Sequence, residues 1–120
     1  MTITQSESYS AAWAGGEDAV RAATAEAVER LGGSRPALVV FFADARRPPD
    51  QVIEQAVAGS GGARLAGMSA SGVMTEDGFQ DGGCSAMAFG GEGFAVGIGV
   101  AREASRDLRA AGSAAAAAAV

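Results

Sequence analysis

Histidine and lysine are absent from this chain of 120 residues, and cysteine occurs once, at position 84. Without histidine there is no Ser-His-Asp or Cys-His catalytic arrangement, and no imidazole that exchanges a proton near neutral pH. Zinc sites built from histidine and several cysteines are excluded as well. A single cysteine forms no internal disulfide, so nothing indicates an oxidising compartment. We therefore expect no catalytic residues, no cofactor and no metal site.

Long apolar runs are also missing. The longest, residues 114–120, is far below the roughly 20 residues that a membrane-spanning helix needs. Residues 1–9 are polar and lack the basic region and apolar run of a secretion signal. Nine arginines against fourteen acidic residues give a net charge of −5, which repels nucleic acid and anionic membranes. These features predict a cytoplasmic protein without nucleic-acid or membrane partners.

The residues that are present favour a folded domain, since 48% are apolar and 19% are charged. Apolar positions recur at helical spacing over residues 17–31, and Gly32 and Gly33 supply a left-handed stop. Two charged pairs four residues apart should support the outer face of this helix. They are Glu17 with Arg21 and Glu26 with Arg30.

Residues 37–43, Ala-Leu-Val-Val-Phe-Phe-Ala, are an unbroken apolar run and predict a central strand that is covered on both faces. A second strand is expected over residues 64–68, with a helix between the two, so the strands should pair in parallel. That helix should begin at Pro48 and end at residues 59–62. Its buried side is expected to consist of Val52, Ile53, Ala56 and Val57.

The ends of the chain are less regular. Residues 2–13 suggest an edge strand, and residues 84–89 and 94–100 predict an antiparallel hairpin around a glycine-rich turn. Gly97 and Gly99 allow another backbone or a ligand to approach, and close packing of a helix is the favoured explanation. An alanine-rich helix should follow from residue 103 to 120. The whole predicts one α/β domain with a mixed sheet of four to five strands and three helices.

The order of these elements resembles the N-terminal region of the FIST domain family. The most specific stretch is Gly-Met-Ser-Ala-Ser-Gly at residues 67–72, which is similar to the family's turn after its second core strand, often Gly-Cys-Ser-Thr-Ala-Gly-Glu. Met68 stands where the family often has cysteine, and Val73 where it often has an acidic residue. The second departure would alter or abolish binding if that acid contacts ligand.

The resemblance implies an intracellular sensory domain of bacterial signal transduction that binds a small ligand, such as an amino acid, and is not an enzyme. We expect residues 1–120 to be a single FIST N-like domain and a partial chain, lacking the C-terminal FIST domain with which such domains are usually joined. Expected partners are therefore a small molecule, a C-terminal FIST domain or a signalling output protein, and a second copy of the chain.

Ligands of open α/β sheets bind beyond the carboxyl ends of the strands, which predicts a site between the end of the central strand and the turn at 67–72. There the carboxylate of Asp44 would face an ammonium group of the ligand. Serine hydroxyls and glycine amides would hold the ligand's carboxylate. The predicted ligand-binding residues are Asp44, Gly67, Met68, Ser69, Ser71 and Gly72.

Other interpretations remain open at this stage. Ser69, Ser71 and Asp44 are equally well explained as turn residues. For Arg46 and Arg47 a solvated turn is favoured over an anion clamp. Residues 69–83 form a polar loop of the kind that often carries function. The chain could instead be a structural module that packs on a partner domain or on itself. An enzyme using oxygens of Asp44, Ser69 and Glu76 is the weakest alternative.

Overall fold

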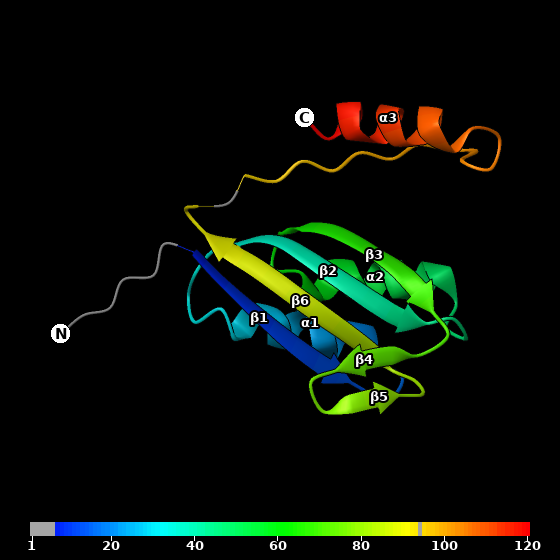
Figure 1. Ribbon diagram of the computed structural model, residues 1–120. Coiled ribbons are helices and arrows are strands. Elements are labelled where there is room, and N and C mark those ends of the chain that lie inside the picture. Colours follow the sequence, from blue (N-terminus) through cyan, green and yellow to red (C-terminus); the bar gives the residue numbers. More distant parts are fainter. Residues whose placement is uncertain (1–6, 94) are drawn as a thin grey trace.

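The computed structural model describes residues 7–93 and 95–120, which form a sheet, two helices on one of its faces, a small hairpin and a separate C-terminal helix (Figure 1). The strands and helices follow one another in an α/β order, which confirms the predicted fold class. The elements are β1 (Glu7–Ala14), α1 (Ala19–Glu29), β2 (Pro36–Asp44), α2 (Pro49–Gly59), β3 (Arg64–Ala70), β4 (Val73–Thr75), β5 (Gly78–Gln80), β6 (Cys84–Gly91) and α3 (Leu108–Ala118).

The main sheet has four strands in the order β1-β6-β2-β3, so β2 and β6 are central and β1 and β3 are the edges. The predicted parallel pair is confirmed, because β2 and β3 run parallel with Phe42 opposite Met68. β6 is antiparallel to both of its neighbours, with Met87 opposite Ala11 of β1 and Val40 of β2. The sheet is therefore mixed, and β1 is the edge strand that residues 2–13 suggested; residues 2–6 lie outside the described part.

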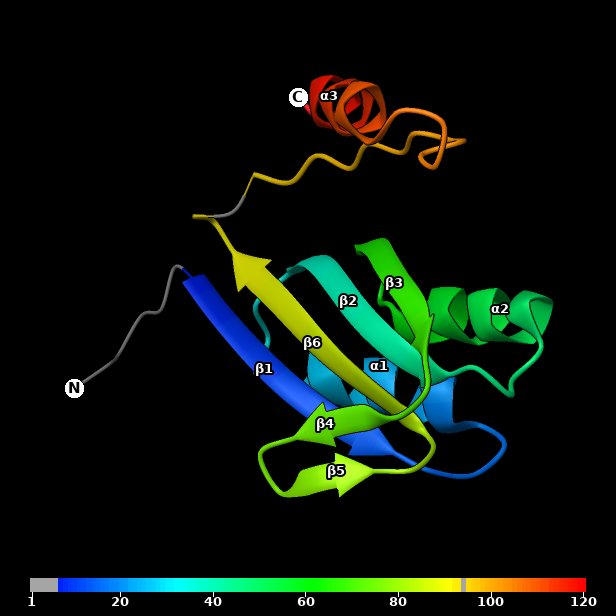
Figure 2. The ribbon, with the colours of Figure 1, turned by 45° about the vertical axis from the view of Figure 1, so that its right-hand side comes forward.

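Helix α1 packs on the sheet through small side chains. Figure 1 shows α1 and α2 behind the strands, and in the turned view of Figure 2 α2 lies to the right of β3. Glu26 and Arg30 form the predicted ion pair at 2.9 Å. Arg21 pairs at 3.0 Å with Asp18 rather than with Glu17, because the helix begins only at Ala19 and Glu17 belongs to the preceding turn. Gly32 and Gly33 end the segment with positive φ angles of 65° and 98°, as predicted.

Helix α2 packs against α1, and its buried strip is narrower than the sequence suggested. Ala56 and Gly59 are buried and Val52 is half-buried, whereas Ile53 and Val57 are exposed. The prediction that all four apolar side chains face the core is wrong for these two. Because α2 rests on another helix rather than flat on the strands, only one line of small residues is covered.

Residues 84–100 do not form the predicted hairpin. Residues 84–91 are the strand β6, but residues 95–100 are not a strand, and Phe94 lies outside the described residues. The reason is topological, since both edges of β6 are already paired with β1 and β2. Residues 97–99 pack on α3 instead, where a Cβ on Gly97 or Gly99 would fall 1.6 Å from the carbonyl oxygen of Ala119 or 1.8 Å from that of Ala115. The favoured explanation of these glycines, close helix packing, is confirmed.

The polar segment 69–83 is partly regular. It contains a two-stranded antiparallel hairpin in which β4 pairs with β5 and Met74 lies opposite Phe79. The Thr75 hydroxyl accepts a hydrogen bond from the Asp77 backbone at 3.1 Å and so supports the turn. Val73 is buried where β4 meets β2 and β6. The segment is therefore a folded flap at one end of the sheet rather than an open loop.

One face of the main sheet carries no helix among the described residues. Val39, Phe41 and Ala43 alternate onto the helix side and are buried, whereas Val40 and Phe42 point to the opposite side and remain partly exposed. The expectation that β2 is covered on both faces is wrong for this part of the chain. We call this side the uncovered face. Its large apolar side chains are Tyr9, Trp13, Leu38, Val40, Phe42, Met68, Met87 and Phe89, and Arg64, which pairs with Leu38, lies on the same side.

Candidate ligand cleft

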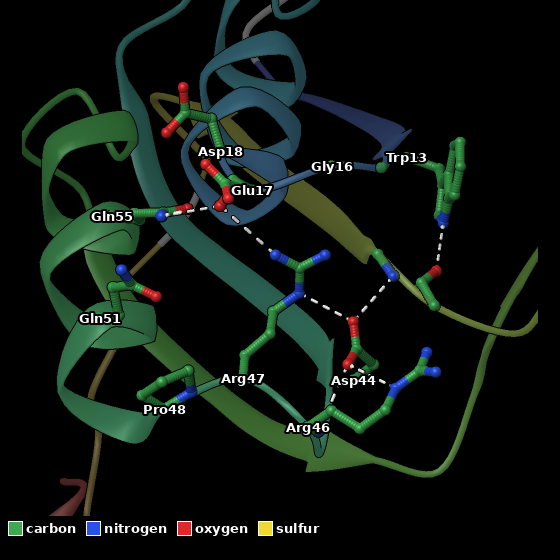
Figure 3. Close-up of a pocket in the computed structure, with 13 residues that line it drawn as sticks. Trp13, Gly16, Glu17, Asp18, Asp44, Arg46, Arg47, Pro48, Gln51 and Gln55 are labelled. Atoms are coloured by element: carbon green, nitrogen blue, oxygen red, sulfur yellow. Dashed lines mark hydrogen bonds and ion pairs between the residues drawn. The ribbon is translucent and has the colours of Figure 1, made fainter.

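A cleft of about 740 Å³ opens at the carboxyl ends of β1 and β2 (Figure 3). Trp13 at the end of β1 and Asp44 at the end of β2 contribute to its walls, together with the segments that lead into α1 and α2 and the chain before β6. Both helices begin beside it, so their backbone amides and positive dipole ends lie at the cleft. This is the edge of an α/β sheet where ligands are usually bound.

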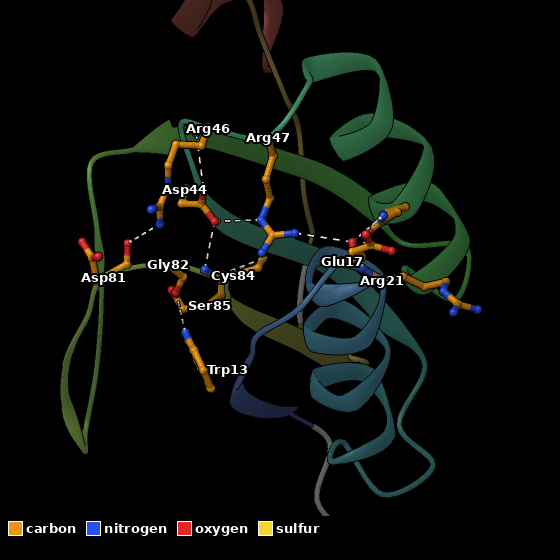
Figure 4. Close-up of polar contacts among 12 residues, drawn as sticks. Trp13, Glu17, Arg21, Asp44, Arg46, Arg47, Asp81, Gly82, Cys84 and Ser85 are labelled. Carbon is orange, nitrogen blue, oxygen red and sulfur yellow. Dashed lines mark hydrogen bonds and ion pairs between the residues drawn. The ribbon is translucent and has the colours of Figure 1, made fainter.

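Asp44 is the hub of the cleft's polar contacts (Figure 4). Its side chain is buried, and the residue as a whole is 5% exposed. One carboxylate oxygen accepts hydrogen bonds from Nε of Arg47 at 2.8 Å and from the amide of Gly83 at 2.9 Å. The other accepts two from Arg46, one from its Nε and one from its backbone amide, both at 3.3 Å. Burial acts to raise the pKa of Asp44, but the hydrogen bonds from Gly83 and Arg47 outweigh it and lower that pKa below its ordinary value.

The two arginines after Asp44 differ in environment. The Arg47 side chain is 18% exposed and also donates to the carbonyl of Glu17 at 3.4 Å. The Arg46 side chain is 69% exposed and donates to the carbonyl of Asp81 at 2.8 Å. Two guanidinium groups thus share one carboxylate, which leaves a local excess of one positive charge beside the cleft. Arg46 is exposed, as the solvated-turn interpretation expects, whereas Arg47 is mostly covered, which that interpretation does not expect.

The opposite side of the cleft belongs to the start of α1. Glu17 is exposed there, and its carbonyl also accepts a hydrogen bond from Nε2 of Gln55 at 3.0 Å. Figure 3 shows Glu17 and Asp18 across from Arg46. The indole of Trp13 supplies an apolar surface, held by a 3.1 Å hydrogen bond from its ring nitrogen to the carbonyl of Gly82. The cleft therefore combines a cationic side, an acidic side and one aromatic surface.

The backbone geometry explains why the residue whose amide donates to Asp44, Gly83, is a glycine. Gly83 has a φ of 88°, and a Cβ there would come within 2.3 Å of the carbonyl oxygen of Ala14. Only glycine therefore lets this segment pass β1 while its amide reaches the carboxylate. The next residue, Cys84, is fully buried, and burial raises the pKa of its thiol to about 11. Cys84 is therefore a buried residue of β6 and a poor nucleophile.

The structure divides the six residues predicted to bind ligand. Asp44 lines the cleft, whereas Gly67, Met68 and Ser69 belong to β3, and Ser71 and Gly72 lie between β3 and β4. The carboxyl ends of β2 and β3 are adjacent, since Asp44 pairs with Ala70, but the other five predicted residues do not line the cleft.

Two of these residues have packing roles that the sequence did not suggest. A Cβ on Gly67 would fall 2.6 Å from the ring of Phe41, and one on Gly72 would fall 2.5 Å from the ring of Phe79. Both glycines therefore make room for aromatic rings. Ser69 and Ser71 are exposed at the end of β3, and their contact with a ligand stays a prediction.

Sequence reasoning missed Trp13, Glu17 and Gly83 as parts of the cleft. Their positions depend on β1 pairing with β6, a contact between residues about 70 apart that no local pattern reveals. A signal did exist for Arg47, because Asp44 three residues earlier matches the spacing of a local ion pair.

The fold and the cleft define an α/β domain whose strand ends carry a polar hollow of ligand size. The model of the FIST N domain matches residues 37–119, which is more than half of the chain. The chain therefore belongs to the FIST N family, a sensory domain of signalling proteins that is typically non-catalytic. No curated protein matches it in a sequence comparison. None of the helices described here has the length and apolarity needed to cross a membrane.

Proposed function

We propose that this FIST N domain is an intracellular sensory module that binds a small amino-acid-like ligand in the cleft at the ends of β1 and β2. The observation that carries the proposal is the charge arrangement around Asp44. One buried carboxylate faces two guanidinium groups, of which Arg46 is largely exposed and sits beside the cleft. An exposed arginine with part of its donors unused suits a ligand carboxylate.

The acidic side of the cleft fits the other end of such a ligand. Glu17 is exposed and makes no side-chain ion pair within residues 7–93 and 95–120, so it is free to meet an ammonium group. Asp44 is less suited to this role than the sequence suggested, because the two arginines and Gly83 already occupy its oxygens. In this arrangement Asp44 orients the arginines, and Trp13 contacts the apolar part of the ligand.

The test is thermal unfolding and calorimetric titration with three matched probes: L-glutamate, succinate, which lacks the ammonium group, and putrescine, which lacks carboxylates. A ligand that binds only the native state at a hundred times its dissociation constant adds about 2.7 kcal/mol of stability. We expect saturable binding of the amino acid and much weaker binding of the other two probes.

Two variants test where the ligand binds. Arg46→Gln should weaken binding about tenfold or more, since a charge-assisted hydrogen bond is lost, while the fold is retained because this side chain is exposed. Ser69→Ala with Ser71→Ala tests the alternative at the end of β3. If the serine variant loses binding and Arg46→Gln does not, the ligand lies at the β3 turn and the cleft proposal is wrong.

A further inference from the structure

Residues 81–83 connect the β4–β5 hairpin to β6, and each of them is held by a different side chain of the cleft (Figure 4). We call these residues the strap. The carbonyl of the first, Asp81, accepts a hydrogen bond from Nη2 of Arg46 at 2.8 Å. The carbonyl of the second accepts one from the indole of Trp13 at 3.1 Å, and the amide of the third donates to the carboxylate of Asp44 at 2.9 Å. The whole strap is thus tied to the wall of the cleft.

The hairpin itself has little other support. Val73 is buried where β4 meets β2 and β6, but none of residues 74–80 is buried, and Met74 and Phe79 are 80% and 67% exposed. A two-stranded hairpin is only marginally stable in water on its own, and segments with few buried contacts open readily. The hydrogen bonds of the strap therefore contribute to holding the hairpin in the position that the structure shows.

Arg46 connects the strap with the part of the cleft that is open to a ligand. A guanidinium group has five N–H donors, of which Nε donates to Asp44 at 3.3 Å and one on Nη2 donates to Asp81. The remaining donors have no acceptor among the residues that the structure describes. Because the side chain is 69% exposed, these two bonds set its orientation. A Cβ on Gly82 would fall 2.8 Å from Nη2, so the guanidinium lies directly against the strap.

We propose that ligand binding in the cleft closes the β4–β5 hairpin through the strap, with Arg46 as the coupling residue. A ligand carboxylate on the remaining donors of Arg46 restrains its guanidinium, and the bond to Asp81 then breaks less often. The coupling is reciprocal, because an open hairpin removes one of the two anchors of Arg46 and so weakens ligand binding. The inference rests on the proposed function for its ligand, whereas the strap can be tested without one.

Closure of the hairpin changes what the domain presents at this end of the sheet. Met74 and Phe79 lie opposite each other in β4 and β5, and both side chains are mostly exposed. A hairpin that opens and closes carries this apolar pair with it. The domain then has two arrangements of the same surface, and the ligand favours the closed one because only that arrangement keeps Arg46 fully anchored.

The first test is hydrogen–deuterium exchange of the ligand-free protein. Trp13→Phe, which removes the indole donor but keeps an aromatic ring, and Arg46→Gln should each speed exchange of residues 73–80 about threefold or more. Unchanged exchange of α1 shows that a variant is folded. Arg106→Gln is the matched control, because its side chain is 78% exposed and pairs with Glu103 rather than with the strap. If both strap variants exchange as slowly as the unmodified chain, the proposal is overturned.

The second test repeats the exchange with L-glutamate, and calorimetry measures binding in the same samples. Saturating L-glutamate should slow exchange of the hairpin about fivefold or more, while exchange of α3 stays the same. Binding of L-glutamate without any change in the hairpin overturns the coupling and leaves the proposed function intact. If L-glutamate does not bind, the ligand of the proposed function is wrong. The ligand-free variants then decide the inference, since faster exchange supports the strap and unchanged exchange refutes it.

Discussion

Gly59 of α2 lies so close to Thr24 of α1 that a Cβ on the glycine would fall 2.0 Å from the threonine hydroxyl oxygen and 2.7 Å from the carbonyl oxygen of Arg21. The hydroxyl is held in place by a 2.8 Å hydrogen bond to the carbonyl of Val20. The two helices therefore pack backbone to backbone at this point, and the pair can tolerate no added methyl group without moving apart.

Replacing Gly59 with alanine should lower the free energy of unfolding by about 1–3 kcal/mol, as overpacking in a filled core does. Denaturant unfolding followed by circular dichroism measures the change. Gly112→Ala is the matched control, because nothing lies within 4 Å of a Cβ at that position in α3. The control should leave stability unchanged or raise it, and a similar loss in both variants would refute the packing explanation.

Replacing Asp44 with asparagine should destabilise the domain at pH 7 by about 3 kcal/mol, since it leaves the mostly buried guanidinium of Arg47 without its charge partner. The pKa of Asp44 is lowered in the folded protein, so its contribution is fully present above the unfolded value of about 3.9 and is lost as pH falls through the folded pKa. The stability difference between the two proteins should therefore shrink between pH 5 and strongly acidic pH. A difference that is constant with pH would contradict this role.

The thiol of Cys84 should resist alkylation in the folded protein at pH 8. Burial raises its pKa to about 11 and leaves it no exposed surface, so reaction requires opening of the sheet. Iodoacetamide labelling followed by mass spectrometry measures the rate, with Ser71→Cys as an exposed comparison and denaturant as the unfolded reference. Labelling of Cys84 as fast as that of the exposed position would show that β6 opens readily.

Asp107 caps α3, because its carboxylate accepts a hydrogen bond from the backbone of Ala110 at 3.0 Å. Asp107→Ala should weaken this helix by about 1 kcal/mol and reduce the helical circular dichroism signal, whereas Asp107→Asn should retain most of it. No change in helicity would show that packing rather than capping holds the helix.

Much of the fold could be predicted from local patterns. The periodicity of α1, the apolar run of β2, the crossover to β3 and the glycine stops at Gly32 and Gly33 all depend on near neighbours, and the structure agrees with each. The predicted hairpin of 84–100 failed because pairing of β6 is decided by β1, far away in sequence. An apolar segment predicts a strand, but it does not predict which other strand pairs with it.

The cleft illustrates the same limit. Asp44 could be chosen from sequence, because polar residues at strand ends are frequent ligand contacts. Its true neighbours, Arg47 and Gly83, were separated by a turn and by a whole hairpin. The pairing of Arg47 with Asp44 matches the spacing of a local ion pair, but no spacing rule links Asp44 with the amide of Gly83.

The position of β6 between β1 and β2 also governs the order in which the domain can be completed during synthesis. Until residues 84–91 leave the ribosome, β1 and β2 have no strand between them and cannot belong to one sheet. The residues of α1 and α2 have been synthesised by then. Closing a contact across so many residues is slow compared with forming a helix. Of the strands described here, β6 is synthesised last, and it joins β1 to the rest of the sheet.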